Sequence, residues 1–389
     1  MVNRGTEQQG APAEPGNDHD GRAQQPGAGA RLRSARQARG LSQYQLARMA
    51  RVSRQAVSAI EAGLSDPSLR VALTLGRALG LTVEALFGPA MPEPSEPVRA
   101  LAPRGNEGRR VTLAPMGETF VALPLSGATV TSAGFGPAGG RVSGPQEVVP
   151  LQPLRPTLLV AGCDPALPLL KLPLSLLDPP VEFQWWPCAS EEALGLAAAG
   201  LVHVAGAHLR GRSGDYNTSA AGELLRGGAD VIGFSSWREG LVLRPEHAAR
   251  VADVAGVVAA GLRLVNREPG AEARRVLDRE LARLGVSGPA LAGYDTRATG
   301  HLEVAAAIEA GLADAGVASE PAALAYGLAF VPLTAERFDL IIPAGMSGTR
   351  EVQGLLRVLS SSWLLGQLAS LPGYDVTQCG ERIASLPPA

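Results

Sequence analysis

Residues 41–63 read LSQYQLARMARVSRQAVSAIEAG, and this stretch decides the fold of the N-terminal part of the chain. Ser42 and Ser53 stand where helix N-caps are expected, and each is followed by residues that favour helix. Gly40 and Gly63 stand where helices usually end, because glycine readily adopts the left-handed conformation found there. The spacing therefore predicts two short helices joined by a tight turn.

Each of the two predicted helices carries one apolar face. The apolar residues recur at the spacing of a buried helical stripe, and they are Leu46, Ala47, Ala50, Val52, Ala56, Val57 and Ile60. Packing these faces together leaves Arg54, Gln55 and Ser58 outward on the second helix. Arginine and glutamine form bidentate hydrogen bonds with guanine and adenine edges, and serine bonds to either. The second helix is therefore predicted to read DNA.

The flanking segments predict three more helices, over residues 31–39, 68–79 and 82–87. Together, residues 31–87 resemble the phage-repressor, Xre-type DNA-binding family. The resemblance rests on the Leu-Ser-Gln opening, the Val-Ser-Arg-Gln-Ala-Val-Ser turn and recognition helix, the Ile-Glu-Ala-Gly ending, and the Pro-Ser that starts the next helix. It implies that Arg54, Gln55 and Ser58 face the major groove and that Gln43 contacts a phosphate. We assign seven residues to this DNA-binding surface: Arg39, Gln43, Arg51, Ser53, Arg54, Gln55 and Ser58.

Charge is unevenly placed along the chain. Residues 31–61 hold seven arginines against Glu61 alone, a net charge of +6, whereas the whole chain has a formal charge of −2. The remainder therefore carries −8. A basic segment on a DNA-binding motif favours contact with phosphates, so double-stranded DNA is the expected partner.

Length and composition predict several globular domains. The chain has 389 residues, of which 46% are hydrophobic and 19% charged. We divide it into a disordered tail over 1–29, a helix-turn-helix domain over 30–88, a proline-rich linker over 89–108, a small β-rich connector over 109–155 and a ligand-binding domain over 156–389. The expected class is thus multidomain, with an all-α five-helix domain followed by an α/β domain.

From residue 156 onward, apolar runs alternate with stretches that can form helices. The runs are residues 157–161, 181–185, 202–205, 240–243 and 262–265. This alternation predicts βα units and a mostly parallel sheet, and the length suffices for two lobes.

Residues 157–385 resemble the solute-binding, periplasmic-binding-protein-like domain that is fused to helix-turn-helix regulators, in the branch that takes molybdate or tungstate. The segments that carry the resemblance are 160–167, 202–209, 240–243, 265–270, 299–308, 313–317 and 371–375. It implies two lobes whose strand-to-helix turns point N–H groups at an anion in the cleft. The candidate ligand-binding residues are Cys163, Asp164, Ser190, His208, Arg267, Gly270, Arg274, Thr299 and His301.

One turn departs from the pattern of this family. Relatives continue Ser-Gly-Thr-Arg after the Pro-Gly at 269–270, whereas this chain has Ala-Glu-Ala-Arg at 271–274. A carboxylate at Glu272 disfavours a neighbouring anion unless it faces away or pairs with Arg274. Three alternatives stay open: an oxyanion such as molybdate or tungstate, another small molecule, or no ligand.

Several classes of protein are not expected. The N-terminus lacks the apolar core of a secretory signal, and no run of ~18 apolar residues occurs, so we expect a cytoplasmic protein without a membrane span. The three cysteines have no CxxC spacing, which argues against a disulfide framework or a structural zinc site. No cofactor is expected, and the scattered histidines are interpreted as structural residues rather than metal ligands; they are His203, His208, His247 and His301.

The leading hypothesis is a ligand-responsive transcription regulator that binds a two-fold-related operator as a homodimer. The alternative is a small-molecule receptor or storage protein in which the helix-turn-helix head only tethers or dimerises. An enzyme is not expected, because the chain has no GxSxG, Walker, HExxH or Rossmann motif.

Overall fold

The computed structural model describes residues 28–87, 96–100, 109–117, 119–125, 136–144, 146–151, 155–211 and 214–388. The chain divides into two units, Met1–Glu93 and Pro94–Ala389. Of the tail expected over 1–29, residues 1–27 lie outside the described residues, and the first helix already begins at Ala28.

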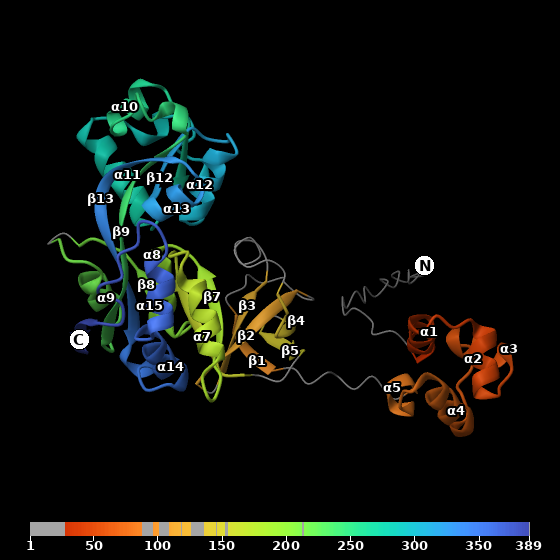
Figure 1. Cartoon of the computed structure of the whole chain (residues 1–389). Coiled ribbons are helices and arrows are strands. Elements are labelled where there is room, and N and C mark those ends of the chain that lie inside the picture. Colours follow the sequence, from red (N-terminus) through yellow and green to blue (C-terminus); the bar gives the residue numbers. More distant parts are fainter. Residues whose placement is uncertain are drawn as a thin grey trace, which may run out of the picture. The chain divides into compact units, whose positions relative to one another are not determined.

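The described part of the first unit is helical throughout its regular structure (Figure 1), as the sequence predicts. Serines 42, 53 and 68 cap three of the helices, since each side chain accepts a backbone N–H three residues later. The core includes Leu32, Leu46, Val57 and Leu75, all fully buried. The helices are α1 (Ala28–Ala38), α2 (Gln43–Ala50), α3 (Arg54–Glu61), α4 (Leu69–Leu79) and α5 (Val83–Phe87).

A closed five-stranded barrel begins the second unit, with the strands in the order β1-β3-β2-β4-β5. It is built from β1 (Glu96–Ala100), β2 (Arg110–Met116), β3 (Thr119–Pro124), β4 (Gly140–Gly144) and β5 (Glu147–Pro150). The β-rich connector of the sequence thus takes the form of a barrel. It starts earlier than residue 109, because β1 lies in the segment 89–108 that we expected to be linker.

The barrel packs against the domain that follows it. Met116, Val121 and Leu123 share a hydrophobic core with Leu159 and neighbouring residues of that domain. The guanidinium of Arg99 also donates hydrogen bonds to two carbonyl oxygens at the C-terminal end of helix α8. These contacts join barrel and domain into one packed body.

The rest of the second unit is built on a single nine-stranded sheet, with the order β11-β10-β12-β9-β13-β8-β6-β7 and with β14 beside β9. The outer strands pair in parallel, whereas β9 and β13 pair antiparallel with each other and with their neighbours. The expectation of a mostly parallel sheet was therefore wrong at its centre. The strands are β6 (Thr157–Gly162), β7 (Glu182–Pro187), β8 (Val204–Ala207), β9 (Ala229–Leu243), β10 (Leu264–Arg267), β11 (Arg297–Ala298), β12 (Ala315–Ser319), β13 (Ala329–Pro343) and β14 (Arg382–Leu386).

Strands β9 and β13 run through both lobes of this domain (Figure 1). Lobe 1 holds β6, β7, β8 and β14 with α7 (Lys171–Ser175), α8 (Ser190–Ala198), α9 (Thr218–Leu224), α14 (Arg350–Leu359) and α15 (Ser362–Ala369). Lobe 2 holds β10, β11 and β12 with α10 (Val254–Ala259), α11 (Glu272–Arg283), α12 (His301–Glu309) and α13 (Glu320–Ala325). Short 3-10 helices occur at 167–170, 245–247, 288–290 and 344–346.

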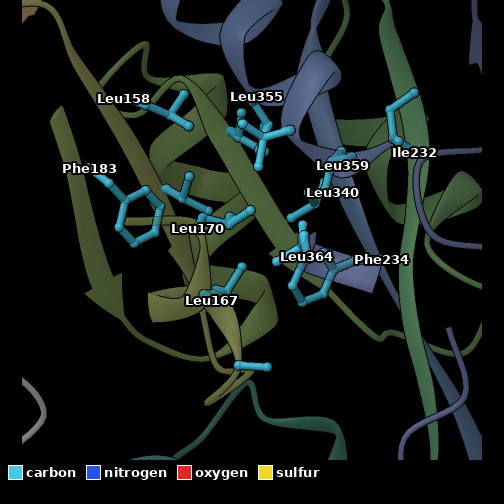
Figure 2. Close-up of a cluster of buried hydrophobic side chains, with 14 of the residues drawn as sticks. Leu158, Leu167, Leu170, Phe183, Ile232, Phe234, Leu340, Leu355, Leu359 and Leu364 are labelled. Carbon is cyan, nitrogen blue, oxygen red and sulfur yellow. The ribbon is translucent and has the colours of Figure 1, made fainter. Parts of the chain in front are cut away.

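The core of lobe 1 is shown in Figure 2, where leucines of β6, α14 and the helical turn at 167–170 meet aromatic rings from β7 and β9. Phe183 and Phe234 supply two of these rings.

No helix among the described residues is long and apolar enough to cross a membrane.

Candidate functional site

Helix α3 of the first unit presents the predicted DNA-reading residues. Arg54, Gln55 and Ser58 are exposed, while Val57 and Ile60 on the opposite face are buried. The Oγ of Ser53 accepts the backbone N–H of Ala56, so this serine fixes the start of α3. The arrangement leaves the first turns of α3 free for a nucleic acid, as the pattern requires.

Glu61 at the end of α3 holds three helices together. Its carboxylate is buried and accepts hydrogen bonds from Arg36 of α1 at 2.6 and 3.0 Å and from the Nε2 of Gln43 at 2.9 Å. Burial alone would raise the pKa of Glu61, but the hydrogen bonds from Arg36 and Gln43 outweigh it and hold the pKa below its ordinary value. Gln43, expected at a phosphate, therefore has its amide group committed to Glu61 in this structure.

Two further arginines of the predicted DNA surface are exposed. Arg51 ends α2 in the left-handed conformation, with φ of 55°. Arg39 lies just after α1, and its Nη1 approaches the carbonyl oxygen of Ala78 at 3.5 Å. Both side chains remain accessible to a phosphate backbone.

The second unit contains a buried polar cluster where β9 and β13 cross between the lobes. Alternate residues of a strand point to one face, so Trp237 and Glu239 of β9 face the same side as Glu336 of β13, which pairs with Trp237. Register shifts at Pro332/Thr334 and Phe338/Asp339 interrupt the ladder beside them. All three side chains are at least 96% buried.

His208 lies at the centre of this cluster, directly after β8. Its Nδ1 is 3.7 Å from the Oε2 of Glu336 and 3.9 Å from the Oε2 of Glu239, distances too long for hydrogen bonds. Its ring centroid lies 5.6 Å from that of Trp237 and 5.5 Å from that of His301. The sequence does not show that His208 and the two glutamates converge, because one follows β8 and the others lie within β9 and β13.

Buried side-chain atoms without a hydrogen-bond partner gather here. Among the described residues they include both ring nitrogens of His208, both carboxylate oxygens of Glu239 and of Glu336, and the indole nitrogen of Trp237. Burying such groups without partners costs free energy. A site that tolerates this cost within a folded domain is a candidate binding site.

Burial and close charges shift the pKa values in the cluster. Burial raises the pKa of Glu239 to about 8 and also raises that of Glu336. Burial disfavours charge on His208, but the adjacent Cys163, Glu336 and Glu239 side chains outweigh it and raise its pKa well above the ordinary value. Strongly shifted groups in a cleft are typical of functional sites.

His301 begins helix α12 in lobe 2 and faces His208. Its Nδ1 accepts the backbone N–H of Ser319 at 3.2 Å, so its Nε2 must carry the proton of the neutral ring. That Nε2 has no hydrogen-bond partner. Burial and the nearby Arg267 lower the pKa of His301 well below its ordinary value, so the ring is neutral and offers a donor to the cleft.

The candidate Arg267 is fully buried but already paired. Its Nε and Nη2 each donate to the carboxylate of Glu268 at 2.8 Å, which leaves only Nη1 without a partner. The negative charge of Glu268 neutralises the positive charge of Arg267. Arg267 can therefore offer one remaining N–H group to a ligand rather than a free cation.

Asp164 and Ser190 are engaged in structural contacts. Asp164 accepts hydrogen bonds from Tyr374, Ser235 and the backbone N–H of Ala166, each at 2.8 Å. Ser190 accepts the backbone N–H of His208 at 3.2 Å. Both were candidates for ligand contact, and in this structure their side chains fix the loops around the cluster.

The turn that departs from the family pattern points its acidic residue away from Arg274. Glu272 is fully buried, and its Oε1 lies 2.8 Å from the Nη1 of Arg279. Arg274 instead donates to the carbonyl oxygen of Arg267 and stacks 4.8 Å from the ring of Tyr294. The pairing of Glu272 with Arg274 that we considered is thus replaced by pairing with Arg279.

Two cavities flank the cluster. One, of about 230 Å³, lies between the lobes and is lined by Cys163 and Trp185 of lobe 1 and by Thr299, Gly300 and His301 of lobe 2. The other, of about 410 Å³, is lined by residues that include Trp237, Glu336 and Tyr374. Gly270 is in neither lining. It has a left-handed φ of 86°, and a Cβ placed on it would lie 3.0 Å from the Oε2 of Glu191 of α8.

Sequence reasoning found part of this cluster and missed the rest. Cys163, His208 and His301 were candidates, and ligating atoms of the three lie within 4.8 Å of one another. Trp237, Glu239 and Glu336 were missed. Their signal was a carboxylate inside each of two otherwise strand-like segments, since a charged residue in a buried strand needs a reason to be there.

Two segments of the chain match models of known protein families. Residues 32–86 match the model of a helix-turn-helix family, and residues 174–360 match that of a PBP superfamily domain. The uncharacterized protein YvgK of Bacillus subtilis (strain 168) is 24% identical over 242 residues, which cover 61% of this chain and 78% of YvgK.

Two solved structures match separate parts of the chain. The first is a putative phosphate ABC transporter substrate-binding protein from Clostridium perfringens, solved with bound phosphate. It is 11% identical with a TM-score of 0.42, and the match covers 57% of this chain and 99% of that protein. The restriction-modification controller protein C.AhdI of Aeromonas hydrophila is 40% identical, with a TM-score of 0.15, over 15% of this chain and 91% of C.AhdI.

The chain therefore combines an Xre-type helix-turn-helix domain at residues 32–86 with a PBP-like domain at residues 174–360. The first is a DNA-binding domain and the second a ligand-binding fold, and both agree with the fold class expected from the sequence.

Proposed function

We propose that this chain is a transcription regulator that reads operator DNA with α3 and responds to a small ligand in the cleft between its two lobes. The observation that carries the proposal is the exposed set Arg54, Gln55 and Ser58 on a capped recognition helix, in a chain that also holds a binding-protein fold. A DNA partner favours action in the cytoplasm.

The DNA-binding half is tested by fluorescence anisotropy with the full chain. The probes are a fragment from upstream of its own gene and a scrambled fragment of equal composition. Arg54→Ala should weaken specific binding by roughly 1–3 kcal/mol, about 5-fold to 150-fold, and relax the preference at one base pair. Arg77→Ala is the matched control, because Arg77 is an equally exposed arginine of the same unit but lies on α4. Equal affinity for both fragments at moderate salt would contradict the regulator function. It would favour the alternative, a small-molecule receptor whose helix-turn-helix head only tethers or dimerises.

We propose that the chain acts as a homodimer. Leu69 and Leu73 of α4 and Leu81 beyond it are exposed apolar residues on a small helical unit, and a second copy would cover them. Dimerisation also doubles the number of base contacts on a two-fold operator. Sedimentation of the wild-type chain and of Leu73→Glu tests this; a wild-type monomer at the concentration that saturates DNA contradicts it.

The ligand-binding half rests on the partnerless buried atoms around His208, Glu239 and Glu336. A bound molecule would provide the missing partners. An oxyanion such as molybdate or tungstate is the less favoured ligand, because Arg267 is already paired with Glu268 and any ionised form of Glu239 or Glu336 would repel an anion. Thermal shift with molybdate, tungstate and sulfate tests the oxyanion alternative, since a ligand at 100 times its Kd stabilises by about 2.7 kcal/mol.

We further propose that the chain works by binding and not by catalysis. The proposal rests on the binding-protein fold of the domain. The thiol of Cys163 and the imidazole of His208 lie within 4.8 Å of each other, and covalent catalysis would need such a pairing of a nucleophile with a base, so activity must be tested directly. Turnover of any tested substrate by the purified chain, abolished by His208→Ala, would contradict this view.

A further inference from the structure

The cluster around His208 has the composition of a metal site. Ligand atoms of His208, Glu239 and Glu336 lie within 4.8 Å of one another, and each of the three residues is at least 98% buried. The imidazole nitrogens and all four carboxylate oxygens lack hydrogen-bond partners. We propose that these three side chains bind a divalent transition-metal cation, which is the effector that the receptor senses. The inference rests on the receptor function proposed above.

The spacing of the ligand atoms fits a single ion. Two ligands at ~2.1 Å from a tetrahedral zinc ion lie roughly 3.4 Å apart. The Nδ1 of His208 is 3.7 Å from the nearest Glu336 oxygen and 3.9 Å from the nearest Glu239 oxygen. Ligand oxygens of Glu239 and Glu336 lie within 4.8 Å of each other, so side-chain adjustments would be needed to bring all three residues onto one ion. These separations are too long for hydrogen bonds, so the groups are placed for something between them.

Charge favours a cation over other occupants. Glu239 and Glu336 together carry two negative charges when ionised, and these balance a divalent ion to give a neutral buried cluster with a neutral His208. The described arginines around the cluster are already paired with other carboxylates. The pairs are Arg267 with Glu268, Arg279 with Glu272, Arg238 with Glu320 and Arg337 with Asp339. A buried charge without a partner is costly, and metal coordination is one of the ways proteins satisfy it.

The ligand types select among cations. An imidazole favours zinc, iron, cobalt or nickel, whereas magnesium and calcium prefer all-oxygen sites. Cys163 and His301 lie beside His208 but are not assigned as ligands. His301 Nδ1 accepts the N–H of Ser319, so its Nε2 carries a proton and offers no lone pair.

The position of the ion would couple it to the lobes. His208 follows β8 of lobe 1, while the glutamates lie on the two strands that cross into lobe 2. The ion would link the two long strands to the segment after β8 in lobe 1. The cavity of about 410 Å³ beside Glu336 and Trp237 leaves room for water molecules or a small anion to complete the coordination.

The test uses the full-length chain, stripped of metal with a chelator and dialysed separately against Zn²⁺, Co²⁺, Mn²⁺ or Mg²⁺. We expect one equivalent of Zn²⁺ or Co²⁺ per chain and weaker binding of Mg²⁺. Glu239→Gln, Glu336→Gln and His208→Ala should each lower the affinity for Zn²⁺ by at least roughly 10-fold, the smallest loss seen even for residues that only support a ligand. The double glutamine variant should bind no metal.

Three controls keep the result interpretable. Glu309→Gln changes an exposed glutamate of α12, and His247→Ala removes a histidine in the short 3-10 helix that follows the lobe 2 end of β9. Both variants should bind Zn²⁺ as the wild type does. Cys163→Ser should also retain the affinity to within a few-fold. Without metal, thermal melts check that both glutamine variants remain folded, so that a loss of Zn²⁺ affinity is read from folded protein.

Several outcomes overturn the proposal: no bound transition metal in the wild type, unchanged Zn²⁺ affinity in the double glutamine variant, or loss of binding in Cys163→Ser alone. Stabilisation by molybdate that survives in the glutamine variants would do the same. None of these results bears on the DNA-binding experiment, which is read out with a separate probe. Failure of the metal site and failure of the regulator function are therefore distinguishable.

Discussion

Replacing Glu61 by glutamine should destabilise the helix-turn-helix unit strongly. The carboxylate accepts two hydrogen bonds from Arg36 and one from Gln43, and thereby joins α1, α2 and α3. Glutamine keeps one acceptor but places an NH₂ group against donors of these neighbours. The guanidinium of Arg36 then loses its counter-charge and at least one of its two hydrogen bonds to residue 61, while it keeps its bond to the carbonyl oxygen of Leu41.

The magnitude follows from the burial of the pair. Removing one partner of a buried ion pair costs about 3–5 kcal/mol. The side chain of Arg36 is 11% exposed and that of Glu61 is fully buried, so water can reach only one side of the pair, and we take the lower end, about 3 kcal/mol. Hydrogen exchange of amides in residues 43–61 should then become about 100-fold faster, because each 1.4 kcal/mol corresponds to tenfold.

The assay is hydrogen exchange of the full chain, read by mass spectrometry of peptides from each unit. Asp66→Asn is the matched control, since it makes the same charge change at an exposed position of the same unit. Peptides of the second unit should be unaffected in both variants. Exchange of residues 43–61 within threefold of the wild-type rate in Glu61→Gln would refute the role given to this carboxylate.

Three other predictions concern pH, packing and the tail. The folded-state pKa of Glu61 lies below its unfolded value, so Glu61 adds to the free energy of unfolding at neutral pH. This contribution is lost as the pH falls below about 4.5 and through the folded pKa. The same exchange assay at pH 7 and at pH 3.5, with Glu61→Gln as reference, measures the loss. Gly206→Ala places a Cβ 2.2 Å from the ring of the fully buried Phe338. This clash should lower the free energy of unfolding by about 1–3 kcal/mol in tryptophan-monitored melts. The control Gly195→Ala, whose Cβ would meet nothing within 4 Å, should leave the free energy of unfolding unchanged. Deleting residues 1–27 should leave the affinity for operator DNA nearly unchanged in anisotropy titrations, and a large loss would show that this segment contributes to binding.

The helical unit was predictable in detail because its signals are local. Caps at Ser42 and Ser53 and a stripe that includes Leu46 and Val57 are read from neighbouring residues. The fold class of the second unit followed from alternating apolar runs and from resemblance. The central antiparallel pair did not, because periodicity cannot show which strands meet when β9 and β13 are separated by some eighty residues of chain.

The candidate site was predictable only in part for the same reason. Cys163, His208 and His301 follow strand ends, where binding residues of α/β folds usually lie. Glu239 and Glu336 lie within long strands, and only the cross-strand register brings them to His208. Likewise, nothing local indicates that Glu272 pairs with Arg279 rather than Arg274.

The two strands that run through both lobes also constrain how the protein is made. β9 ends at Leu243, but its partner β13 occupies residues 329–343. While the ribosome synthesises the intervening segment, β9 has an unpaired edge along its whole length, which invites pairing with other chains. Neither lobe can close its sheet until Pro343 has emerged. Truncated products that end before this point should therefore aggregate rather than fold as a single lobe, and we expect neither lobe to fold when it is expressed on its own.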